Sequence, residues 1–110
     1  MELGDCFQAA VNYMVQQGPS SGLTLVHAEV MGQGDIDGKQ FAHAFCVDSN
    51  DIVIDKSNGR DIRLPKAIYY AIGRIYDIDN YHEYDYLEMS KMCVRYKHYG
   101  PWDLETSTGL

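Results

Sequence analysis

Three side chains in this sequence supply the parts of an activated thiol: Cys6, His43 and Asp55. A cysteine thiolate is a good nucleophile, a histidine can take up the thiol proton, and a carboxylate can orient the histidine ring. Cys6 follows Asp5, a good helix cap, in the stretch GDCFQAA. Backbone N–H groups in the first turn of a helix favour a thiolate, although the negative charge of Asp5 opposes it. The sequence therefore predicts nucleophilic chemistry at Cys6.

The other two cysteines are expected to be core thiols. Cys46 is three residues after His43 on the same predicted strand, so its side chain points to the opposite face of the sheet. Cys93 lies among apolar residues of a predicted helix. Three cysteines without a C-x-x-C pair do not indicate a disulfide framework, and free thiols fit a reducing compartment.

The order of these residues resembles that of the papain-like cysteine hydrolase superfamily, in its compact bacterial and transglutaminase-like forms. The motifs that carry the resemblance are GDC with Ala9 and Ala10 behind it, HAFCVD, and VIDKSNG. The pattern is also similar to that of small uncharacterised phage-type proteins. The resemblance implies a Cys-bearing helix packed on an antiparallel sheet, with Cys6, His43 and Asp55 as the catalytic residues.

The sequence offers more than one donor that could stabilise an oxyanion, because the residues before Cys6 contain no glutamine of the kind that papain-like enzymes often use. The backbone N–H of Cys6 is one candidate, and the side chain of His27 or of Gln33 is the other. We expect His27 to line the cleft or to be buried and hydrogen-bonded. His27, Glu29 and His43 lack the close grouping of metal ligands, so no metal and no cofactor is predicted.

The turn between the two central strands decides which aspartate can orient His43. Asp48 is five residues after His43, so a regular strand points it to the opposite face. A three-residue loop of residues 48–50 would pair His43 directly with Asp55, whereas a two-residue turn would set Lys56 opposite the ring. The first register groups apolar side chains on both faces, so we predict that register and Asp55 as the orienting carboxylate.

Hydrophobic periodicity and turn residues predict the elements that position these side chains. A helix capped by Asp5 is expected to run until Gly18, with Phe7, Ala10, Val11 and Met14 as its apolar face. Strands are expected at 23–31, 41–48, 51–57, 60–64 and 80–86. The order of helix, antiparallel strands, helix, strand and helix predicts an α+β fold: a Cys-bearing N-terminal helix on an antiparallel sheet, with two further helices.

The two later helices are predicted from their caps and apolar stripes. Pro65 is placed at the first position of the second helix. Its apolar stripe is Ile68, Ala71, Ile72 and Ile75. Asp85 and Glu88 predict the cap of the third helix, and Trp102 is expected to dock the C-terminal tail. The apolar residues of that helix are Leu87, Met92, Cys93 and Tyr96.

Length and composition limit the function classes. The chain has 110 residues, which suits a single domain over residues 1–110. Its formal charge of −7 with only nine scattered lysines and arginines argues against nucleic acid as a partner. No apolar run reaches the length of a membrane span and no basic or apolar signal segment begins the chain, so a cytoplasmic location without membrane contact is expected.

These observations together predict a cysteine peptidase or amidase that cleaves an amide or related acyl bond through an acyl-enzyme. Its expected substrate is a peptide or a modified protein. Two alternatives stay open at this point: acyl transfer of the transglutaminase type, which uses the same residues, and a catalytically silent binding module or inhibitor in which Cys6 is structural. The sequence does not indicate an oligomeric state.

Overall fold

A computed structural model describes residues 5–31, 40–76 and 78–104 of the chain. Three helices are present in these ranges: α1 (Asp5–Gln17), α2 (Lys66–Gly73) and α3 (Tyr86–Tyr96). The strands are β1 (Thr24–Met31), β2 (Gln40–Val47), β3 (Ile52–Asp55), β4 (Ile62–Pro65) and β5 (Tyr81–Tyr84). Two short 3-10 turns complete the list, η2 (Ser57–Gly59) and η3 (Ile78–Asn80). The predicted α+β fold is confirmed at this level: an N-terminal helix with a buried Cys6 packs on a five-stranded antiparallel sheet, with two further helices.

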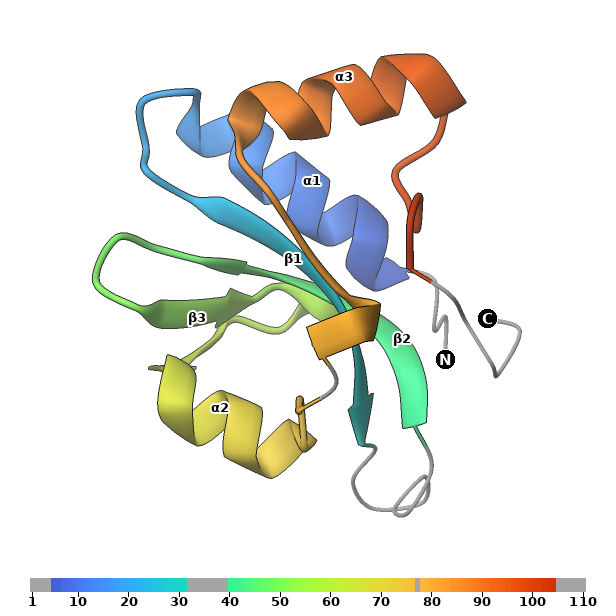
Figure 1. The fold of residues 1–110 in the computed structure, drawn as a ribbon. Helices are drawn as coiled ribbons and strands as arrows, with labels where there is room; N and C mark the ends of the chain where they lie inside the picture. Colours follow the sequence, from blue (N-terminus) through green and yellow to red (C-terminus); the bar gives the residue numbers. More distant parts are fainter. Residues whose placement is uncertain (1–4, 32–39, 77, 105–110) are drawn as a thin grey trace.

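The sheet is a single layer with helices on both faces (Figure 1). Its strand order is β4-β3-β2-β1-β5, and every neighbouring pair is antiparallel. Helices α1 and α3 cover one face and α2 covers the other. Because side chains alternate between the faces of a strand, β2 contributes to two separate apolar layers.

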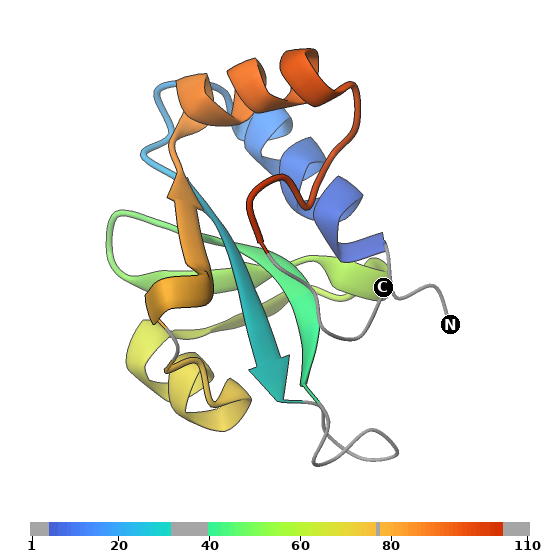
Figure 2. The ribbon, with the colours of Figure 1, turned by 45° about the vertical axis from the view of Figure 1, so that its right-hand side comes forward.

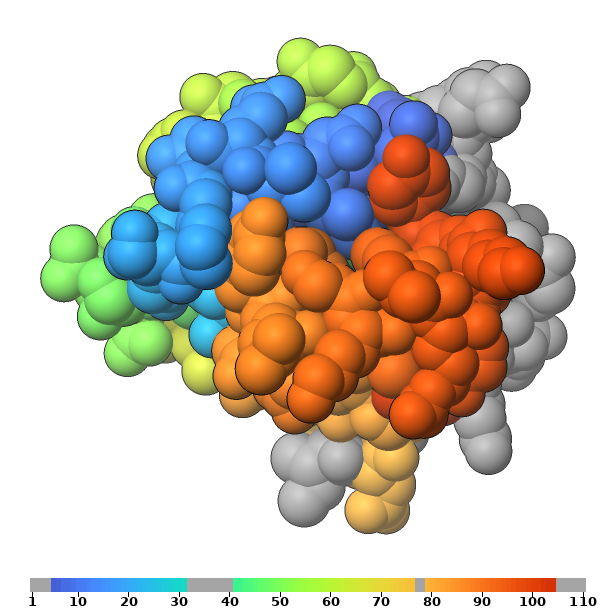
Figure 3. Space-filling model, turned by 90° about the horizontal axis from the view of Figure 1, so that it is seen from above, coloured from blue at the N-terminus to red at the C-terminus, as the bar shows by residue number. Residues whose placement is uncertain are grey.

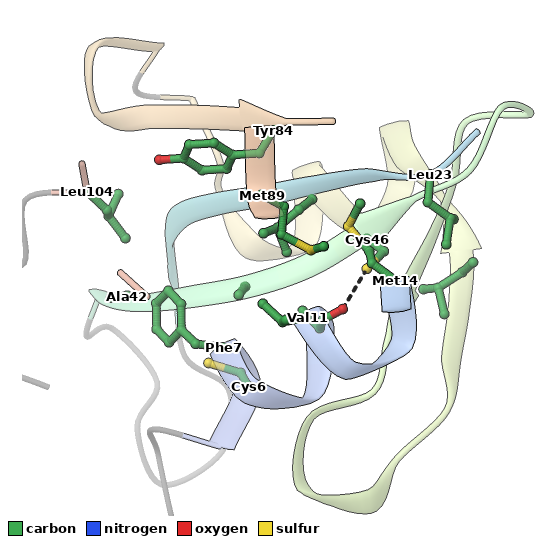
Figure 4. Packing of buried hydrophobic residues seen from close by; sticks show 14 residues of the cluster. Cys6, Phe7, Val11, Met14, Leu23, Ala42, Cys46, Tyr84, Met89 and Leu104 are labelled. Carbon is green, nitrogen blue, oxygen red and sulfur yellow. Dashed lines mark hydrogen bonds between the residues drawn. The ribbon is translucent and has the colours of Figure 1, made fainter. Parts of the chain in front are cut away.

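The layer under α1 and α3 contains the larger apolar core (Figure 4). Phe7, Val11 and Met14 of α1 point into it, which confirms the predicted apolar face of that helix. Cys46 is fully buried there, and its thiol donates a hydrogen bond to the carbonyl oxygen of Ala10 over 3.5 Å. Burial, reinforced by the charge of Asp55, raises the pKa of the Cys46 thiol to about 12. Cys46 is therefore a core thiol, as predicted.

The last helix and the tail also follow the sequence. Asp85 and Glu88 form a capping box, in which each side chain accepts a hydrogen bond from the backbone N–H of the other residue. Helix α3 lies beside α1 (Figure 3), and partly buried Cys93 packs against the core. The chain after α3 passes close to the N-terminal end of α1 (Figure 2) and docks through Trp102 and Leu104. Leu87, in contrast, is exposed and does not belong to the core.

The predicted buried face of α2 is wrong within the helix, and of its four residues only Ile75, which follows the helix, is buried. Ile68 and Ile72 are each 49% exposed, and the helix instead turns Tyr69 and Tyr70 toward the sheet. Pro65 is the last residue of β4 and the N-cap of the helix, one position earlier than predicted. Aromatic rings on a strand face explain the difference, because Phe45 offers Tyr69 and Tyr70 ring contacts that the isoleucines lack, with centroids at 4.9 and 5.7 Å.

The predicted register of the β2–β3 hairpin is also wrong, although His43 and Asp55 do lie on the same face of the sheet, as predicted. Val47 pairs with Val53 and the loop consists of residues 49–51. Asp48, directly after β2, donates its N–H to the Ile52 carbonyl over 3.0 Å, and its carboxylate accepts the N–H groups of Asn50 and Ile52 over 2.9 and 3.0 Å. The observed pairing differs from the predicted one by two residues, so His43 and Asp55 share a face but are diagonal neighbours.

In the part of the chain that the structure describes, no helix has the length and apolar character needed to cross a membrane.

The corrected face of α2 can be tested by two isoleucine substitutions. Ile68→Gln should change the free energy of unfolding by less than about 0.5 kcal/mol, because the side chain is half exposed. Ile75→Ala should cost about 2 kcal/mol or more, because Ile75 is 8% exposed and packs in the layer under α2. Urea denaturation of both variants gives the two values, and equal losses would contradict the observed helix face.

Candidate active site

The site forms where β3 ends and the chain leaves the sheet. The β2–β3 pairing includes Cys46 and Val47, and beyond Asp55 the chain turns into η2. Asn58 of this turn adopts a left-handed conformation, and its N–H donates to the Asp5 carboxylate of α1 over 2.9 Å. This contact brings the first turn of α1 to the edge of β2. The carboxylate predicted as a helix cap therefore also ties α1 to η2.

His43 and Asp55 are in direct contact at this edge. The ring Nε2 of His43 lies 2.9 Å from Oδ2 of Asp55. Both side chains are buried, with 6% and 3% of the residue surface exposed. They point to the α2 side of the sheet, together with Phe45 and Val53. The structure thus brings together the two residues that were predicted to form the base and its orienting carboxylate.

The Asp55 carboxylate accepts three further hydrogen bonds. Its Oδ1 accepts from the Ser57 backbone N–H at 2.9 Å and from the Ser57 hydroxyl at 2.6 Å, and its Oδ2 accepts from the Tyr69 hydroxyl at 2.8 Å. Burial by itself raises the pKa of Asp55. The hydrogen bond and charge of His43 and the two hydrogen bonds from Ser57 outweigh it and hold the pKa well below its usual range. Asp55 is therefore an ionised, fully bonded carboxylate.

Cys6 is the second hydrogen-bond partner of the His43 ring. Burial lowers the pKa of His43, but hydrogen bonds to Asp55 and to the Cys6 side chain, with the negative charges of both groups, raise it to about 9. Because Asp55 occupies Nε2, Nδ1 is the ring nitrogen available to the thiol. The ring is consequently protonated at neutral pH and lies between two acceptors.

Cys6 itself belongs to the apolar core under α1 and is 3% exposed. It lies in the first turn of α1, next to Phe7 (Figure 4). His43 points to the opposite side of the sheet, so the two residues meet around the edge of β2. The three predicted catalytic residues are thus neighbours, and their catalytic role stays a prediction.

His27 is enclosed in the α1 layer. Its ring is fully buried, and its centroid lies 4.8–5.1 Å from those of Phe7, Tyr84 and Trp102. Among the described residues neither ring nitrogen has a hydrogen-bond partner. Burial, with a smaller contribution from the charge of His82, lowers the pKa of His27 to about 3. His27 is therefore a neutral ring that lines no open cleft, and an oxyanion role would require its aromatic neighbours to move.

The remaining candidates lie elsewhere or outside the described residues. Gln33, the other predicted oxyanion donor, is outside them. Asp48 is engaged in its own turn, as expected for a residue on the opposite face. Glu29 accepts a hydrogen bond from the Asn80 side chain. Within residues 5–31, 40–76 and 78–104, no group of three histidine, cysteine or acidic side chains could hold a metal ion.

Sequence reasoning missed two residues that contact Asp55. Ser57 lies two residues after the aspartate, the spacing at which an aspartate often accepts from a following backbone N–H, so this contact had a local signal. Tyr69 is fourteen residues after Asp55, on a face of α2 that was not predicted to contact the sheet. The sequence does not indicate that Tyr69, and not Tyr70, would contact Asp55. Identifying it required the packing of α2 on the sheet.

The unpaired state of His27 predicts an acid-sensitive loss of stability. The pKa is 6.5 in the unfolded chain and about 3 when folded, so the unfolded chain binds the extra proton first as the pH falls. The stability that His27 contributes is therefore complete above pH 6.5 and is lost between 6.5 and about 3. In His27→Leu, the free energy of unfolding should fall less between pH 7 and pH 4.5 than in the parent.

Urea denaturation at both pH values makes this comparison, and a packing cost that is equal at both pH values cancels. His82→Gln, on the adjacent strand β5, is the control and should retain most of the acid-side loss, because burial is the larger cause of the lowered pKa of His27. An unchanged pH dependence in His27→Leu would contradict the assigned protonation of His27.

Comparison of the chain with protein-family models, with curated proteins and with solved structures finds no match. The functional argument therefore depends on the geometry of Cys6, His43 and Asp55.

Proposed function

We propose that the protein is a cysteine hydrolase that cleaves an amide or related acyl bond through a covalent acyl-enzyme. One observation carries the proposal: the buried His43 ring hydrogen-bonds to the Asp55 carboxylate through Nε2 and also to Cys6. A thiol, an imidazole and a carboxylate in this order form an activated nucleophile. The papain-like resemblance of the motifs supports the same assignment.

In the acylation step, His43 carries the transferable proton and the sulfur of Cys6 attacks the carbonyl carbon of the substrate. A C–S bond forms, and the carbonyl oxygen becomes an oxyanion. The backbone N–H groups in the first turn of α1 are the candidate donors to that oxygen. His43 then gives its proton to the leaving nitrogen or oxygen, and the acyl thioester remains on Cys6.

In the deacylation step, His43 takes a proton from a water molecule, and the resulting hydroxide attacks the thioester carbon. The C–S bond breaks, the acid product leaves, and the proton returns to the Cys6–His43 pair. Asp55 stays ionised throughout and stabilises the protonated ring, which fits its lowered pKa. An amine in place of water would give acyl transfer with the same residues.

The expected substrate is a peptide or a modified protein, because a thiol with a histidine base suits carbonyl carbons that carry an amide or ester leaving group. The net charge of −7 disfavours a polyanionic substrate.

A binding module is the second candidate function, and the burial of Cys6 favours it. A thiol that is 3% exposed cannot meet a carbonyl carbon until a neighbouring group moves. In a binding module, the same thiol would be a small core residue at the start of α1. The reactivity of Cys6 separates the two functions.

We expect iodoacetamide to alkylate Cys6 before Cys46 and Cys93 near neutral pH. His43 holds a proton beside Cys6, whereas burial raises the pKa of the other two thiols. Mass spectrometry of the alkylated peptides over time gives the three rates. His43→Gln should slow the reaction at Cys6 and leave the other two rates unchanged. Equal, slow labelling of all three cysteines would refute the hydrolase and support the binding module.

Asp55 and Asp48 provide a matched pair in the same hairpin. Asp55→Ala should lower the Cys6-dependent hydrolysis of p-nitrophenyl acetate by a few orders of magnitude, because His43 loses its orienting carboxylate. Asp55→Asn should be milder, since an amide oxygen can still accept from the ring. Asp48→Ala should change turnover little, because that carboxylate bonds only to its own turn in the described structure.

Cys6→Ala sets the background rate for these measurements, and thermal unfolding confirms that each variant is folded at the assay temperature. Greater damage from Asp48→Ala than from Asp55→Ala would overturn the assignment of the orienting carboxylate.

A further inference from the structure

We infer that Tyr69 is a positioning residue of the site: its hydroxyl shares Oδ2 of Asp55 with the His43 ring and so keeps the proton on His43 transferable. The inference rests on the proposed function for its catalytic meaning, but its geometry stands independently. Tyr69 comes from α2, whereas His43 and Asp55 come from β2 and β3. Together with α1, which carries Cys6, the site therefore draws on four elements.

The Asp55 carboxylate is saturated with donors. Oδ1 accepts two hydrogen bonds from Ser57, and Oδ2 accepts one from His43 and one from Tyr69. A carboxylate has about four acceptor sites, so all of them are occupied. The Ser57 bonds come from the local turn and fix Oδ1. Tyr69 is the donor that competes with the imidazole for the same oxygen.

The packing of Tyr69 fixes its hydroxyl beside Asp55. Its ring packs on Phe45 of β2 with a centroid distance of 4.9 Å, and Phe45 is fully buried. The same Phe45 ring lies 6.2 Å from the His43 ring. Burial, the charge of Asp55 and their hydrogen bond raise the pKa of Tyr69, so the phenol keeps its proton and remains a donor. Its hydroxyl is thus a fixed dipole directed at Oδ2.

This dipole moderates the pull of Asp55 on the His43 proton. Each donor on a carboxylate oxygen takes up part of its negative charge, and the positive end of the Tyr69 O–H group lies beside the imidazolium. Without the hydroxyl, Oδ2 would hold the ring proton more strongly. His43 would then give up its proton less readily to a leaving group, so turnover would fall although the ring stays in place.

The matched control is on the same helix. Tyr70 also packs on Phe45, with a centroid distance of 5.7 Å, but its hydroxyl pairs with that of Tyr81 and not with Asp55. Tyr69→Phe and Tyr70→Phe each remove one hydroxyl from the α2 layer and keep the ring. They differ in whether the lost hydroxyl touches the Asp55 carboxylate.

The experiment measures the titration of His43 by NMR of the ring nitrogens in the full chain. Tyr69→Phe should raise the midpoint by roughly half a unit, the size expected for the loss of one hydrogen bond. Tyr70→Phe should leave it unchanged. In an Asp55→Asn background, Tyr69→Phe should have no effect on His43, because the shared oxygen has lost its charge.

A midpoint that does not rise in Tyr69→Phe, or that rises equally in Tyr70→Phe, would overturn the inference. If Tyr69→Phe does not fold, the wild-type protein supplies a second test. The ¹³Cζ signal of Tyr69 should change with the same midpoint as His43, and that of Tyr70 should not. A Tyr69 ¹³Cζ signal that does not change as His43 titrates would also overturn the inference.

Failure of the inference and failure of the proposed function can be told apart. The NMR midpoints do not depend on a reactive thiol, so a shift confined to Tyr69→Phe with an inert Cys6 would retain the positioning contact and reject the hydrolase. A reactive Cys6 with no shift in Tyr69→Phe would retain the hydrolase and reject the role of Tyr69.

Discussion

A buried hydrogen bond between the His43 ring and the Asp55 carboxylate connects β2 to the last residue of β3. Burying either charge alone would cost several kcal/mol of free energy in an apolar layer. Pairing the two, and supplying the carboxylate with donors from Ser57 and Tyr69, offsets that cost. The turn at η2 and the docking of α2 are therefore both coupled to the Asp55 carboxylate, because each supplies a hydrogen-bond donor to it.

The same sheet buries a second histidine with the opposite result. His27 on β1 is surrounded by aromatic rings and has no hydrogen-bond partner among the described residues, so its neutral form is favoured. His43 on the neighbouring strand lies between Asp55 and Cys6, so its charged form is favoured. Burial acts in the same direction on both rings, and only the neighbouring acceptors separate them. A histidine on a predicted strand does not reveal by itself which of these environments it will have.

The sequence predicted the helices, the strand order along the chain and the shared face of His43 and Asp55, because these depend on local periodicity and alternation. It did not predict the loop of residues 49–51, since the exact turn depends on how Asp48 bonds to its own backbone. The face of α2 was missed because isoleucines and tyrosines both suit an apolar contact, and the choice was made by Phe45 on a strand distant in sequence. The buried face of α2 was therefore set by contacts between elements, which a local sequence pattern does not contain.

Cys6 belongs to the apolar layer under α1, whereas His43 belongs to the layer under α2. Cys6 and His43 therefore become neighbours only when both helices have packed on the sheet and η2 has met the first turn of α1. A chain with one layer assembled holds either an ordinary thiol or an ordinary histidine–aspartate pair. In the proposed hydrolase, chemical reactivity at Cys6 would then mark the completed fold, and a newly made chain would be protected from acylation until both α1 and α2 have docked.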